Sequence, residues 1–126
     1  MANQINLQPD ILDLSLYAGD GVEFRVLCTN SAGAPVDISG SVSAVVRLER
    51  LTPDPPIVSF AVNLVDAYLG KIILSLTGDQ TMQLAMHPSS KSGKFLGVWD
   101  LQWVPAGSQP RTMCQGKVEC VVDVTR

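Results

Sequence analysis

The side chains that most often carry enzymatic chemistry are sparse in this sequence. His87 is the only histidine, and it precedes Pro88 in a segment without strand or helix periodicity. No serine or cysteine lies in a G-x-S-x-G segment, the strand-to-helix turn that exposes the nucleophile of many hydrolases. The sequence therefore predicts neither a Ser-His-Asp triad nor a histidine-based metal site.

Three aspartates, Asp20, Asp79 and Asp100, carry the group that glycosidases use in pairs. Asp20 stands in a turn and Asp79 follows a helix N-cap, and aspartate is common at both kinds of position for structural reasons. Asp100 falls on the outward side of a predicted strand. Because no spacing brings two of these carboxylates to one cleft, we predict that the protein is not an enzyme.

Glycine and cysteine patterns predict neither a cofactor nor a metal. Gly19 and Gly21 form G-x-G without the third glycine and the following helix of a phosphate-binding loop, so we expect a hairpin turn. Cys28, Cys114 and Cys120 are an odd number without metal-ligand spacing. We expect three buried free thiols. The alternative is a disulfide between Cys28 and Cys120, which cytoplasmic redox conditions disfavour.

Size and composition indicate one β-rich domain. The chain has 126 residues, of which 46% are hydrophobic and only 6% aromatic, and a net charge of −3. Its Val, Leu and Ile residues occur in short runs separated by Gly and Pro, which is typical of all-β proteins. Acidic and basic residues are interspersed, so we expect no nucleic-acid or membrane partner. The absence of a secretion signal in the sequence leads us to expect a protein that is made and kept in the cytoplasm, or that leaves it by a route other than secretion.

The segment KFLGVWDLQWV, residues 94–104, is the predicted central strand. It contains both tryptophans, and its apolar residues recur at every second position. We expect Phe95, Trp99, Leu101 and Trp103 to point into the core. Each aromatic side chain buries about 150–250 Å², so this strand largely decides where the interior lies.

Six further segments alternate in the same way. They are residues 12–17, 22–28, 42–49, 57–64, 71–76 and 111–124, with a bulge predicted at Gly116. One short helical turn is predicted after Thr77, which forms a capping-box pattern with Gln80. Seven strands with regularly spaced turns predict an all-β fold, an antiparallel immunoglobulin-like β-sandwich over residues 11–126, preceded by an N-terminal arm, residues 1–10.

The order of several segments resembles a group of small phage tail and baseplate proteins. These segments are LSLYAGD, AGAPVDISG, VRLER, GKIILSLTGDQTMQL, GVWDLQW and GKVECVVDVTR. They resemble the immunoglobulin-like N-terminal domain of siphophage upper baseplate proteins and related minor tail proteins. The resemblance implies a structural virion component in the tail, assembled in the host bacterial cytoplasm. It also implies a symmetric multicopy assembly with other tail or baseplate proteins, and no small-molecule substrate.

A second hypothesis is a carbohydrate-binding module, because β-sandwiches host many functions. Such sites commonly present an aromatic side chain to a sugar ring. Both tryptophans are predicted to point inward, which leaves Tyr17 and Tyr68 in surface contexts. Sugar binding by the isolated protein would favour this hypothesis over a structural role.

The predicted partner interface consists of apolar residues that the core does not need. Four lie at outward positions of strands expected to share one sheet, and two lie in the N-terminal arm, where an extended segment can add to a sheet edge. They are Val45, Leu96, Val98 and Val121 on the strands and Ile5 and Leu7 in the arm.

Overall fold

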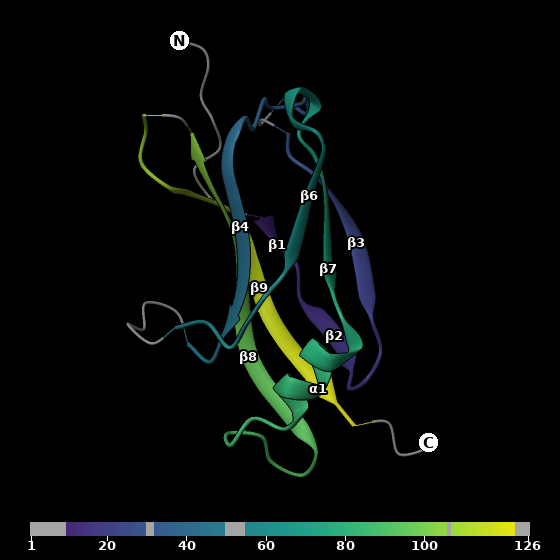
Figure 1. Ribbon diagram of the computed structural model, residues 1–126. Coiled ribbons are helices and arrows are strands. Elements are labelled where there is room, and N and C mark those ends of the chain that lie inside the picture. Colours follow the sequence, from purple (N-terminus) through teal and green to yellow (C-terminus); the bar gives the residue numbers. More distant parts are fainter. Residues whose placement is uncertain (1–9, 30–31, 50–54, 106, 123–126) are drawn as a thin grey trace.

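The computed structural model describes residues 10–29, 32–49, 55–105 and 107–122. In this part of the chain, two β-sheets face each other across a shared hydrophobic core, and one α-helix lies at an end of the sandwich (Figure 1). The all-β, two-sheet architecture predicted from the sequence is confirmed. No helix among the described residues is long and apolar enough to cross a membrane.

The larger sheet has six strands. Its central strands are β4 (Gly40–Arg47), β8 (Lys94–Pro105) and β9 (Arg111–Val121), with β5 (Val58–Ser59) beside β4. On the other side, β1 (Asp10–Ile11) and β2 (Leu14–Tyr17) both pair with β9. These two pairings are parallel, so the prediction of a purely antiparallel sandwich is wrong for this edge.

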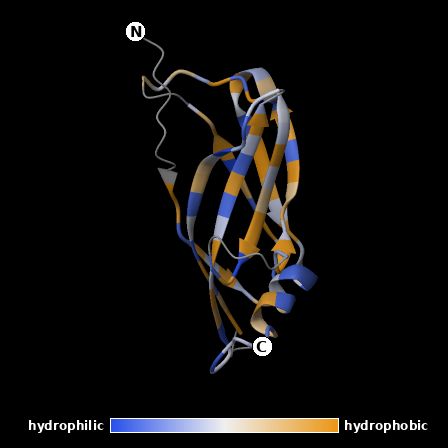
Figure 2. Ribbon diagram, turned by 90° about the vertical axis from the view of Figure 1, so that its left-hand side faces the viewer, coloured by the Kyte–Doolittle hydropathy of each residue, from blue (hydrophilic) through white to orange (hydrophobic). Residues whose placement is uncertain are grey.

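The smaller sheet has three strands. Their order is β3 (Val22–Leu27), β7 (Lys71–Leu76) and β6 (Ala61–Asp66), all antiparallel. A 3-10 helix, η1 (Ala67–Leu69), connects β6 to β7. In Figure 2 the ribbons change repeatedly between hydrophobic and hydrophilic colours, as expected for strands with one face in the core.

Two predicted strands are each divided in the structure. Residues 12–17 were predicted as one strand, but Leu12 lies between β1 and β2 and is 44% exposed. Residues 57–64 were also predicted as one strand, yet β5 belongs to the larger sheet and β6 to the smaller one. The buried Phe60 lies where the chain crosses between the sheets. The alternating pattern continues across the crossing because both sheets face the same core.

The predicted bulge in β9 lies at a different residue. The pairing of β8 with β9 shifts between Leu101 and Gln102, which leaves Met113 as the extra residue, whereas Gly116 pairs regularly with Trp99. A side chain at Gly116 would collide with the carbonyl oxygen of Leu12. The glycine therefore allows the β1–β2 connection to approach β9 closely.

The inward side of β8 holds the centre of the core, as predicted. Phe95, Trp99, Leu101 and Trp103 are all buried. The Trp99 ring contacts Phe24 edge-to-face at a centroid distance of 5.8 Å and Phe60 at 5.6 Å. Its indole Nε1 donates a hydrogen bond to the Leu12 carbonyl at 2.7 Å, so its polar edge is satisfied inside the core.

Helix α1 (Gly78–Ala85) begins with the predicted capping box. The Thr77 hydroxyl accepts from the Gln80 backbone N–H at 3.2 Å, and the Gln80 side chain accepts from the Thr77 N–H at 2.9 Å. The buried Thr81 hydroxyl accepts from Gly19 N–H and donates to the Asp20 carbonyl, both at 3.0 Å. These bonds attach the helix to the turn between β2 and β3.

Candidate functional site

The outer face of the larger sheet brings together the four strand residues of the predicted interface. Since Trp99 and Leu101 point into the core, the alternate residues of β8, Leu96 and Val98, point outward. The pairing then places Val121 opposite Lys94, two residues from Leu96, and Val45 opposite Asp100, two residues from Val98. We call the four residues Val45, Leu96, Val98 and Val121 the larger-sheet patch.

The larger-sheet patch differs in exposure from one residue to the next. Leu96 is 62% exposed, whereas the three valines are half-buried. Tyr17 of β2 pairs with Val121 and is 53% exposed, so it extends the apolar surface to the sheet edge. Sequence reasoning placed Tyr17 at the surface but did not join it to the patch, because the parallel pairing of β2 with β9 leaves no local signal.

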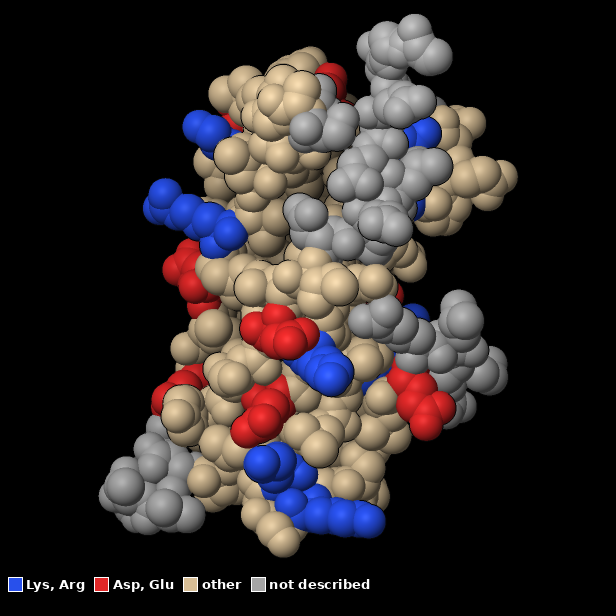
Figure 3. All heavy atoms as spheres, turned by 180° about the vertical axis from the view of Figure 1, so that it is seen from behind, with Lys and Arg blue, Asp and Glu red and all other residues tan. Residues whose placement is uncertain are grey.

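Charged side chains separate the members of the larger-sheet patch. Val98 pairs with Arg47 on one side and with Lys117 on the other. The Lys94 ammonium and the Glu119 carboxylate form an ion pair at 3.7 Å next to Leu96. Figure 3 likewise shows acidic and basic residues interspersed over the back of the molecule. The face is thus a mosaic of apolar groups and compensated charges.

The remaining two residues of the predicted interface, Ile5 and Leu7, lie outside the described residues. The described chain begins at Asp10, which already pairs with Cys114 as part of β1. The last residue assigned to the arm by the sequence is therefore part of the larger sheet.

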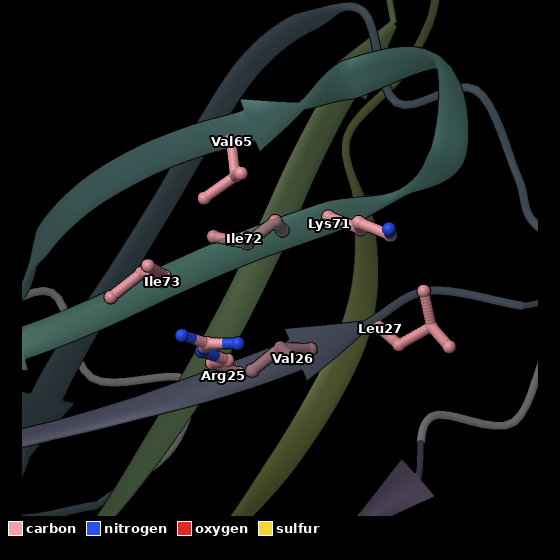
Figure 4. Close-up of a pocket in the computed structure, with 7 residues that line it drawn as sticks. All are labelled: Arg25, Val26, Leu27, Val65, Lys71, Ile72 and Ile73. Carbon is pink, nitrogen blue, oxygen red and sulfur yellow. The ribbon is translucent and has the colours of Figure 1, made fainter.

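The smaller sheet has a second candidate surface that sequence reasoning missed. A hollow of about 320 Å³ lies over β3, β6 and β7 (Figure 4). It is lined by Arg25, Val26, Leu27, Val65, Lys71, Ile72 and Ile73. The sequence alternation already indicated that Leu27 and Ile73 point outward. It gave no indication that β3 and β7 are paired, and this pairing makes the two residues neighbours.

The candidate catalytic carboxylates lie at two places, and two of the three aspartates are near the same helix end. Asp20 and Asp79 are exposed near the start of α1, while Asp100 lies on the outer face of the larger sheet. The His87 ring interacts with the hydroxyl of Ser89 through Nδ1 at 2.8 Å. Across the described ranges, no three His, Cys, Asp or Glu side chains are grouped so that they would hold a metal ion.

The three cysteines are buried and none forms a disulfide, which confirms the expected free thiols. The alternative bridge between Cys28 and Cys120 is not formed. The Cys120 thiol donates to the Thr81 carbonyl at 3.3 Å, and burial raises its pKa to about 11. A thiol with a raised pKa is a poor nucleophile at neutral pH. Cys120 is therefore a buried core residue and not a reactive thiol.

Comparisons with known proteins add little to this description. No family model matches the sequence, and no curated protein matches it. Among solved structures, the chain is similar to a nucleoside hydrolase-related hypothetical protein from Saccharophagus degradans that is associated with carbohydrate metabolism. The identity is 10% and the TM-score 0.30, with 90% of this chain and 22% of that protein covered. At this TM-score the likeness supports no statement about fold family or activity.

Proposed function

We propose that the protein is a structural component of a bacteriophage tail or baseplate, a minor tail protein that acts through protein–protein contacts. One structural observation carries this proposal: the exposed Leu96 lies with Val98, Val121 and Tyr17 on the outer face of the larger sheet. Apolar side chains that share an outer face can form an interaction surface, here with charged side chains between them. The order of the segments along the sequence resembles that of phage tail and baseplate proteins. This resemblance is the reason for proposing a phage tail as the assembly that the protein joins.

We also infer that the sandwich is immunoglobulin-like. In immunoglobulin domains the second, fifth and fourth strands are neighbours in one sheet, and the third, sixth and seventh in the other. The order β3-β7-β6 and the order β4-β8-β9 support this assignment when β3 is taken as the second strand and β5 as an addition beside the third. Surfaces of such domains host many kinds of contact, so the assignment supports a fold and not a partner.

The larger-sheet patch is suited to contact with another protein. Burying apolar surface is worth about 25 cal/mol per Å², so the exposed Leu96 is the member from which a partner gains most. The Lys94–Glu119 pair lies among the apolar residues and would contribute mainly to orientation and to the rate of association.

The test introduces lysines into the larger-sheet patch. We expect Val98→Lys with Val121→Lys to leave the monomer folded, because both side chains point away from the core, and to block its incorporation into particles. Folding is measured by circular dichroism melts, and incorporation by quantitative mass spectrometry of purified particles. The matched control is Ala61→Lys with Gln83→Lys, which adds the same charge at exposed residues elsewhere. Wild-type occupancy of the patch variant in particles would place the docking surface elsewhere.

The arm is tested by a truncation. Removing residues 1–9 spares Asp10 and the β1–β9 pairing, so the domain should fold normally. If Ile5 and Leu7 contact a neighbouring protein, the truncated chain enters particles less efficiently than the full chain. Equal occupancy would limit the interface to the sandwich.

A carbohydrate-binding function is the second candidate, favoured by the exposed tyrosines. Tyr17 lies on β2 and Tyr68 on η1, toward opposite ends of the sandwich, so each would have to act alone (Figure 1). Both tryptophans are buried and unable to stack on a sugar. Saturable binding on a glycan array by the wild-type protein, lost in Tyr17→Ala or Tyr68→Ala, would favour this candidate over a purely structural role.

A further inference from the structure

The outer face of the smaller sheet has charged and apolar side chains in a checkerboard. Arg25 of β3 pairs with Ile73 of β7, and the next outward pair along the strands is Leu27 with Lys71. The two cations therefore occupy one diagonal of this four-residue array and the two apolar side chains occupy the other. Val65 of β6 adds a further apolar group and is 54% exposed. In Figure 4 the nitrogen atoms of Arg25 and Lys71 mark two separate points of the hollow.

The two cations have carboxylates near them but are not held in ion pairs within the described part of the chain. Neither Arg25 nor Lys71 forms an ion pair there. Two carboxylates are near in the sheet register: Glu23 lies two residues before Arg25, and Asp66 pairs with Lys71. The Asp66 carboxylate accepts from the Leu69 N–H at 3.3 Å and so caps η1. Both cations therefore remain available to an external anion, in competition with the Glu23 and Asp66 carboxylates.

The size of the hollow indicates what kind of ligand fits. Small-molecule pockets usually have volumes of about 300–1,000 Å³ and enclose most of their ligand. At about 320 Å³, this hollow is at the lower limit, and it lies on the outer side of the smaller sheet. It accommodates one or two side chains of a larger partner better than it encloses a free ligand.

We propose that this surface binds an extended segment of a partner protein in which an acidic residue and a large apolar residue alternate. In an extended chain, residues i and i+2 point to the same side at a spacing of about 6.4–6.8 Å, which matches the spacing of outward residues on the strands beneath. The long side chains of Arg25 and Lys71 reach toward the carboxylate, and the apolar side chain, two residues along, packs against Val65 and its apolar neighbours in the hollow. This site is separate from the larger-sheet patch, and its existence does not depend on the phage-tail function.

The test uses the full chain, labelled with ¹⁵N, and a synthetic peptide. The peptide is blocked at both ends. Every second residue is alternately aspartate or leucine, and the residues between them are serine, so that aspartate and leucine point to the same side of the extended chain. We expect it to shift the amide signals of Arg25, Leu27, Lys71 and Ile73 in a saturable titration. A peptide with asparagine in place of aspartate should bind about fivefold more weakly, because two exposed charge pairs are lost. A peptide with alanine in place of leucine should bind more weakly as well.

Protein variants complete the test. Arg25→Gln with Lys71→Gln should weaken binding of the aspartate–leucine peptide about fivefold. Lys91→Gln with Lys117→Gln removes the same charge elsewhere and should leave binding unchanged. No shift at millimolar peptide, equal binding of the asparagine peptide, or unchanged binding by the Arg25/Lys71 variant would overturn the proposal.

Two other occupants are distinguished by the same samples. In the first case, dodecanoate shifts these amide signals at a lower concentration than the peptide does. This result would identify a small amphipathic anion as the ligand. Self-association of the wild type in sedimentation experiments, abolished by Arg25→Gln with Lys71→Gln, would identify a second copy of the chain. Either result would overturn the assignment of a partner peptide.

Discussion

Replacing Trp99 by alanine is the most direct test of how this domain is held together. The side chain is 1% exposed and lies against Phe24 and Phe60. Truncating a buried tryptophan costs about 3–5 kcal/mol of unfolding free energy. The variant also removes the donor to the Leu12 carbonyl, and losing such a bond costs about 1 kcal/mol. Because whole domains are stable by about 5–15 kcal/mol, we expect Trp99→Ala to be largely unfolded or close to it.

Two further variants separate the contributions to this loss. Trp99→Phe keeps an aromatic ring in the cluster but removes the indole N–H, so its stability should lie between those of wild type and Trp99→Ala. Leu96→Ala, on the outer face of the same strand, should change the unfolding free energy by less than about 0.5 kcal/mol. Urea unfolding followed by far-ultraviolet circular dichroism measures all three variants on one scale.

The opposite ranking would refute the reasoning. If Trp99→Ala unfolded at nearly the wild-type urea concentration while Leu96→Ala was strongly destabilised, the two faces of β8 would be exchanged. A slip of one residue in register produces that exchange, since neighbouring side chains of a strand point to opposite faces. The larger-sheet patch would then lie in the core, and the proposed docking surface would be lost with it.

Two other predictions concern β9. Gly116→Ala should destabilise the domain by about 1–3 kcal/mol in urea unfolding, because the new Cβ would collide with the Leu12 carbonyl oxygen. If the variant were as stable as wild type, the β1–β2 connection would be free to move away from β9. The raised pKa of Cys120 predicts a stability contribution that is complete below pH 9.0 and declines as the pH rises toward about 11, because the thiol ionises first in the unfolded chain. Thermal melts from pH 8 to 11 should therefore show a steeper decline for wild type than for Cys120→Ala, and parallel curves would contradict this.

The parts of the fold that the sequence predicts well are those determined by neighbours along the chain. The inward residues of β8 follow from strict alternation over a long segment. The start of α1 follows from Thr77 and Gln80, which contact each other three residues apart. In both cases the information that determines the structure lies within a few residues.

The parts that it does not predict depend on partners distant in sequence. Val58, Phe60 and Val62 alternate without interruption, yet Val58 and Val62 belong to different sheets. Periodicity records that a side chain is buried and not which sheet its backbone joins. The parallel pairing of β2 with β9 and the close approach of Leu12 to Gly116 are likewise contacts across about a hundred residues.

The same distinction between local and distant determinants applies to the residues of the two candidate surfaces. Outward positions such as Leu96 and Leu27 could be assigned from alternation alone, because each strand has one core face. The charges that surround them could not, since Lys94 and Glu119 meet only through the pairing of β8 with β9. Residues such as Arg25 and Ile73 become neighbours only through the pairing of β3 with β7.

These neighbouring charges give the two surfaces different physical character. On the larger sheet, Lys94 is compensated by Glu119, so a partner that covers Leu96 gains mainly from apolar burial, a contribution that salt does not screen. On the smaller sheet, Arg25 and Lys71 have no ion-pair partner among the described residues, and attraction of an anion to such exposed charges falls as the ionic strength rises. Two faces with similar apolar side chains should therefore select different partners: the larger sheet a complementary apolar surface, and the smaller sheet a segment that supplies a carboxylate to Arg25 and Lys71.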